Sequence, residues 1–172
     1  MRILYEKILE TFDNNKECFV DKELIAPKFI DLYDSQPDTP EEFEFMCPAI
    51  FIDYNIVWER SGSQRIGTLL LEVHCLSSDT PETDNHSQRL PEGLQKIDFY
   101  ETVADLLDGL ATEETSGLVL TAERPVTTDY FNYHILTFEC TISRSYKGKR
   151  FADGTVEGVK MADSNIKQYL VD

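Results

Sequence analysis

The chain has 172 residues, of which 41% are hydrophobic and 11% are aromatic, and this excludes a disordered chain. Asp and Glu number 32 against 16 Lys and Arg, so the formal net charge is −16, which disfavours binding to a nucleic-acid backbone or an anionic membrane. The start of the chain is charged, and nowhere do about 18 apolar residues run together. The sequence therefore predicts a single cytoplasmic domain with a sizeable core.

The first predicted element is a helix of about three turns. Apolar side chains recur every four residues at Leu4, Ile8 and Phe12, which places one apolar stripe along the helix. The segment that follows, residues 18–44, is polar and contains three prolines, so we expect no long element there. Two short apolar pairs in it, at 19–20 and 24–25, could form short strands.

Residues 45–77 predict a hairpin of two long strands. Residues 45–58 are apolar on both faces, as a central strand requires, and a Ser-Gly-Ser turn follows at 61–63. Residues 66–77 then alternate in polarity, with Leu69, Leu71, Val73 and Cys75 on one face.

The second half predicts a long polar loop, one helix and two closing strands. Residues 78–93 hold a single large apolar side chain, which predicts the loop. Asp98 and Glu101 have the form of a capping box, so we expect the second helix to begin there and to end near Gly109. The closing strands are expected at 118–124 and 133–143. Together these elements predict an α+β domain over residues 1–146, with a mixed, mainly antiparallel sheet packed by two helices, and a polar C-terminal extension over 147–172.

Motifs for catalysis or cofactor binding are missing from the sequence. It has no Gly-rich phosphate loop, no nucleophile elbow and no His or Cys pair at zinc-ligand spacing, so we expect no catalytic residue, no cofactor and no metal site. His74 and Cys75 are neighbours, but adjacent strand residues point to opposite faces, which argues against a thiolate-imidazole pair. Glu72, Glu123 and Glu139 could converge as the metal site of a hydrolase, although a polar strand face is the simpler interpretation.

Charge is unevenly distributed along the chain. Between Lys28 and Arg60 there are eight acidic residues and no basic one, whereas four basic residues cluster after the last predicted strand. Two such patches on one subunit predict that the basic cluster meets the acidic segment of a neighbouring subunit, which would give orientation more than affinity. The predicted subunit-interface residues are Arg144, Lys147, Lys149, Arg150, Asp31, Asp34, Glu41 and Glu42.

Four stretches carry a resemblance to a known family, namely residues 48–58, 65–73, 99–110 and 133–140. Their order resembles the phage tail-terminator, or tail-completion, family of head-tail joining proteins. The resemblance implies a structural protein that forms a ring, usually hexameric, which caps the tail tube and joins it to the head. Its partners would be itself, tail-tube proteins and head-joining proteins, first in the host cytoplasm and then in the virion tail.

The residues leave two alternatives to the tail-terminator function open. One is a monomeric, non-enzymatic adaptor or binding domain whose acidic surface holds a basic protein partner. The other is a metal-dependent hydrolase built on strand carboxylates. The acidic charge argues against specific nucleic-acid binding and against a membrane in both the tail-terminator and the adaptor interpretation. An acidic ring would instead let DNA pass through its lumen without binding it.

Overall fold

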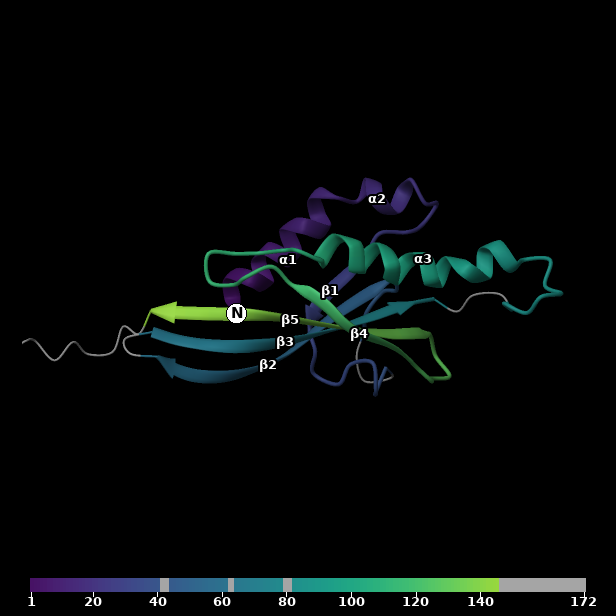
Figure 1. Ribbon diagram of the computed structural model, residues 1–172. Helices are drawn as coiled ribbons and strands as arrows, with labels where there is room; N and C mark the ends of the chain where they lie inside the picture. Colours follow the sequence, from purple (N-terminus) through teal and green to yellow (C-terminus); the bar gives the residue numbers. More distant parts are fainter. Residues whose placement is uncertain (41–43, 62–63, 79–81, 146–172) are drawn as a thin grey trace, which may run out of the picture.

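Three helices lie on one face of a five-stranded sheet in the computed structural model, which describes residues 1–40, 44–61, 64–78 and 82–145 (Figure 1). The strand order is β1-β2-β3-β5-β4; β1 runs parallel to β2 and the other pairs are antiparallel. The predicted α+β fold with a mixed, mainly antiparallel sheet is confirmed. The elements are α1 (Arg2–Asn14), α2 (Glu17–Val20), β1 (Phe29–Leu32), β2 (Ala49–Ser61), β3 (Gln64–Ser77), α3 (Leu90–Leu107), β4 (Val119–Val126) and β5 (Asn132–Ser145).

The core lies between the helices and a ribbon formed by β2, β3 and β5. Ile52, Val73 and Leu136 are register partners across the three strands, and each is at most 1% exposed. Strand side chains alternate between the two faces, so one apolar set per strand meets the helices. The helices cover this face with one apolar stripe each, from α1 Leu4, Ile8 and Phe12 and from α3 Phe99, Val103 and Leu107.

The opposite face of the sheet is called the uncovered face below, because none of the described helices lies on it (Figure 1). Near β1 it carries a small cluster of buried side chains, including Phe51, Leu76 and Tyr133. Toward the other end of the ribbon it carries exposed apolar side chains: Val57 and Val119 are 63% and 57% exposed, and Leu70 is 37% exposed.

The second helix begins earlier than predicted. α3 begins at Leu90, and Asp98 lies inside it, where its carbonyl oxygen accepts a hydrogen bond from the Thr102 hydroxyl at 2.7 Å. The predicted capping box is therefore wrong. Pro91 fits the first turn because the amides there have no intrahelical partner. The polar loop before α3 is correspondingly shorter than expected, and residues 79–81 of it lie outside the described residues.

The segment 18–44 contains no strand at either of the positions suggested by its apolar pairs. Phe19 belongs to α2 and is fully buried, with its ring between those of Phe12 and Phe99 at centroid distances of 6.4 and 5.8 Å. The strand of this segment, β1, comes later and pairs with the start of β2. Aromatic contacts in the folded core, which local sequence does not report, determine this arrangement.

The remaining elements follow the sequence closely. α1 and the β2–β3 hairpin form as predicted, although β2 begins at Ala49 and not at residue 45, and β4 continues through Pro125. β4 is an edge strand, where a proline is tolerated because one side of the strand makes no ladder hydrogen bonds. The predicted extension, residues 147–172, lies outside the described residues.

Substitution of Gly67 tests the close packing of β2 against β3. It is the register partner of Trp58, and a Cβ atom added at Gly67 would lie 2.8 Å from the Val57 carbonyl oxygen and 3.0 Å from the Trp58 ring. The strands must shift to relieve this contact, so Gly67→Ala should lower the free energy of unfolding by about 1–3 kcal/mol. Urea denaturation measures this change. Ser143→Ala, at an exposed position of β5, is the control and should change stability by less than about 0.5 kcal/mol; equal stability of the two variants would contradict the close approach.

Candidate functional site

Three polar side chains from two strands gather on the uncovered face. Asp53 of β2 and Glu72 of β3 are register partners, and His74 follows Glu72 on the same face of β3. One potential ligand atom from each residue, two carboxylate oxygens and one imidazole nitrogen, lie within 4.8 Å of one another. Asp53 and Glu72 are half-buried and His74 is buried. The group can hold a cation, since it presents two acidic groups and one neutral donor.

The His74 ring is held by two tyrosines. The Tyr33 ring stacks on it with centroids 4.3 Å apart and planes inclined by 16°. The Tyr133 hydroxyl shares a hydrogen bond with His74 Nδ1 at 2.5 Å, while His74 Nε2 is buried and has no hydrogen-bond partner. Tyr33 is itself fixed, because its hydroxyl donates to the Asp38 carboxylate at 2.5 Å. The imidazole therefore has a defined orientation, and its second nitrogen, Nε2, makes no hydrogen bond.

Burial dominates the electrostatics of this group. It lowers the pKa of His74 to about 4, although the Asp53 charge opposes that change. Arg124 adds to the lowering. Burial, together with the Asp38 hydrogen bond, raises the pKa of Tyr33 to about 12. At neutral pH the site therefore contains a neutral imidazole and a neutral phenol.

The three glutamates considered as a hydrolase site do not converge. Glu139 lies on the uncovered face but pairs with Leu70, two residues along β3 from Glu72. Glu123 pairs with Leu136 on the helix-covered face, where its carboxylate lies 3.7 Å from His134. The grouping of those three is wrong because strand register separates them. In the fold, Glu72 pairs with Asp53 of β2 instead. The sequence signal for this partner was the presence of a carboxylate within the apolar run of β2.

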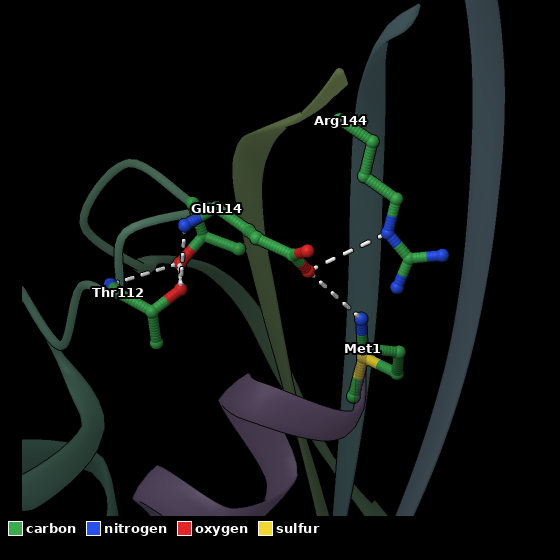
Figure 2. A network of polar contacts seen from close by, with 5 residues as sticks. Met1, Thr112, Glu114 and Arg144 are labelled. Carbon is green, nitrogen blue, oxygen red and sulfur yellow. Dashed lines mark hydrogen bonds and ion pairs between the residues drawn. The ribbon is translucent and has the colours of Figure 1, made fainter. Parts of the chain in front are cut away.

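Arg144, a predicted interface residue, is bound within its own chain (Figure 2). Its Nε donates to a Glu114 carboxylate oxygen at 3.4 Å, and the same oxygen lies 3.7 Å from the Met1 amino group. The Thr112 hydroxyl accepts a hydrogen bond from the Glu114 backbone N–H at 3.2 Å and so fixes the turn. The guanidinium also lies 5.8 Å from the centre of the Trp58 ring. This network attaches the start of α1 to the end of β5.

The other predicted interface residues are distributed as follows. Asp31 lies on the edge strand β1, where its carboxylate accepts the Leu32 backbone N–H at 2.8 Å, and Asp34 is exposed just after that strand. β1 pairs with the start of β2, whereas Arg144 pairs with Arg65 near the start of β3. The described acidic and basic members thus lie at opposite ends of the ribbon. Lys147, Lys149, Arg150, Glu41 and Glu42 lie outside the described residues.

A second histidine lies beside a pocket of about 220 Å³ between α3, β4 and β5. The His134 ring stacks on Tyr100 with centroids 3.8 Å apart, and its buried Nε2 makes no hydrogen bond. Cys75 also lines the pocket, but burial raises the pKa of its thiol, which disfavours a reactive thiolate. Cys75 is therefore not an activated nucleophile.

The chain matches no protein-family model, and no curated protein is significantly similar to it. None of the helices in the described part of the chain is long and apolar enough to cross a membrane.

The buried neutral histidines predict a pH dependence of stability. Burial lowers the pKa of His74 to about 4 from the ordinary value of 6.5, and it also lowers the pKa of His134. Between these pH values the unfolded chain binds protons that the native chain does not, so the free energy of unfolding falls as pH drops from 6.5 toward 4. One pKa unit corresponds to about 1.4 kcal/mol, so His74 should contribute a loss on the order of 3 kcal/mol. Urea titrations at pH 7 and pH 5 measure most of this loss.

Two variants separate the histidine contribution from that of the carboxylates. His74→Phe keeps a ring against Tyr33 and cannot be protonated, so its stability should change less between pH 7 and pH 5 than that of the wild type. His86→Gln, at an exposed position in the loop before α3, should retain the wild-type change. An equal pH dependence in all three proteins would show that His74 is accessible to protons in the native state.

Proposed function

We propose that the chain is a structural, ring-forming component of a phage or prophage tail, a tail-terminator or tail-completion protein that caps the tail tube and joins it to the head. The observation that carries the proposal is the order of the described elements. An N-terminal helix, the short helix α2 and the short strand β1 are followed by a hairpin of two long strands, one long helix and two closing strands. The family resemblance rests on this order.

The uncovered face supports contacts between subunits. The exposed apolar side chains Val57, Ile66 and Leu70 lie on neighbouring strands β2 and β3, and Val119 lies on the edge strand β4. Exposed apolar side chains that cluster on a flat sheet face are typical of surfaces that another protein covers. In a ring, the occupant of this surface would be a second copy of the chain.

A ring with head-to-tail contacts needs two different surfaces on each subunit. The acidic residues at β1 and the basic end of the ribbon meet this requirement, because they lie at opposite ends of the ribbon. Register places Arg60, Arg65 and Arg144 in line across β2, β3 and β5 at the basic end. Since Arg144 is bound to Glu114, the contact with the neighbour would depend on Lys147, Lys149 and Arg150.

The net charge also suits this role. With a formal charge of −16, most of the surface repels phosphate groups. A ring through which DNA passes requires a lumen that does not bind the DNA, and an acidic subunit provides it without a dedicated channel lining.

Cross-linking tests the orientation of the proposed contact. A carbodiimide joins lysine amines to carboxylates that are in ion-pair contact. In the assembled protein it should link Lys147 or Lys149 to Asp31, Asp34, Glu41 or Glu42. A mixture of ¹⁵N-labelled and unlabelled chains, analysed by mass spectrometry, shows whether each link joins two subunits. The links should decrease with salt, because exposed charge pairs are screened at high ionic strength.

Charge reversal provides the matched test. Lys147→Glu, Lys149→Glu and Arg150→Glu together should reduce assembly, measured by mass photometry and negative-stain images, while leaving the subunit folded. The control reverses three exposed charges, Arg2 and Lys7 on α1 and Lys16 just before α2, and should still assemble. A symmetric two-fold dimer that buries the uncovered face would contradict the ring. A gene position away from head-joining and tail-tube genes would contradict the tail function.

A further inference from the structure

We propose that Asp53, Glu72 and His74 form a binding site for one divalent transition-metal ion on the uncovered face. The site is independent of the tail function, since all three ligands come from β2 and β3 of one subunit. It differs from a hydrolase site built on glutamates alone, because it contains an imidazole and two cross-strand carboxylates.

The backbone brings the three ligands together. Asp53 and Glu72 are directly opposite each other in the β2–β3 pair, and His74 is the next residue of β3 on the same face. One ligand atom from each lies within 4.8 Å of the others. An ion about 2.1 Å from each ligand atom requires them to be roughly 3 to 4 Å apart. Asp53 and Glu72 are only half-buried, so small rotations of their side chains close the remaining distance.

The second observation is the unpartnered nitrogen of His74. This residue is 4% exposed, and its Nε2 is buried without a hydrogen-bond partner, which is costly in a native protein. Nδ1 already bonds the Tyr133 hydroxyl. A proton on Nδ1, donated to the Tyr133 oxygen, leaves a lone pair on Nε2. Histidines that bind metals commonly use one nitrogen for the ion and the other for such an orienting hydrogen bond.

The two carboxylates supply the charge for a cation. Like charges directly opposite each other in an antiparallel pair destabilise the sheet. A divalent ion between Asp53 and Glu72 would remove this repulsion and join β2 to β3. The Tyr33 ring, which stacks on His74, shields the imidazole side of the group from water.

The donor set points to the class of ion. Two carboxylate oxygens and one imidazole nitrogen suit Zn²⁺ or Mn²⁺, because imidazole is a good ligand for first-row transition metals. Ca²⁺ and Mg²⁺ prefer oxygen donors throughout and would not use the His74 nitrogen. Three protein ligands leave further coordination positions for water.

Isothermal titration with ZnCl₂ and with MnCl₂ tests the site in the full chain after treatment with a chelator. We expect one ion per chain, with the affinity reduced at least tenfold by Asp53→Asn and by Glu72→Gln. Both substitutions keep the side-chain shape at half-buried positions, and circular dichroism of the metal-free variants checks their folding. Glu59→Gln is the matched control. Glu59 is an exposed carboxylate on the same face of β2, six residues and about 20 Å along the strand from Asp53, and its loss should leave the affinity unchanged.

A second readout identifies the nitrogen ligand. In ¹⁵N spectra of the imidazole rings, Zn²⁺ should shift the Nε2 signal of His74 and leave the signals of His86 unchanged. The proposal is overturned if neither ion binds below about 1 mM, if both variants retain wild-type affinity, or if the shifted signal belongs to another histidine. Tighter binding of Ca²⁺ than of Zn²⁺ and Mn²⁺ would also overturn it, since it would remove the imidazole from the ligand set.

Discussion

Backbone pairing of β3 with β2 on one side and β5 on the other determines which side chains share a face of this fold. Side chains alternate along a strand, so a slip of one residue would exchange the two faces. The buried row Ile52, Val73 and Leu136 lies immediately beside the polar row Asp53, Glu72 and Thr137, and both rows follow from the same register. Burial of the apolar row against the helices thus holds the carboxylates together on the other face, despite their mutual repulsion.

The helices and loops complete this arrangement at the two ends of the ribbon. At one end, Met1, Glu114 and Arg144 form an ion network that attaches α1 to the end of β5 (Figure 2). Such partly exposed pairs contribute little to stability, so their main effect is to orient the first helix and the last strand. At the other end, Tyr33 and its neighbours after β1 cover the buried His74.

Periodicity in the sequence predicted the elements whose burial is regular, namely α1 and the three long strands. It missed α2 because Phe19 is buried by rings from α1 and from the distant helix α3. It missed the start of α3 because Pro91 is compatible with a first helical turn as well as with a loop. The cluster of Asp53 with Glu72 and His74 was missed for a different reason. Sequence patterns for metal sites specify the spacing of the ligands along one chain segment, whereas this cluster depends on the register between two strands. An acidic residue within the apolar run of β2 was the visible signal.

The two proposals use different parts of one face, and the strand spacing keeps them apart. Val57 lies four residues beyond Asp53 on β2, about 13 Å along the strand, and Leu70 lies two residues before Glu72 on β3. A neighbouring subunit that covers the apolar half would therefore end near the carboxylates without filling their space. An ion at Asp53 and Glu72 would tie β2 to β3 at the boundary between the apolar and polar halves. It would stiffen the ribbon next to the subunit contact, so metal binding and assembly are compatible on one face.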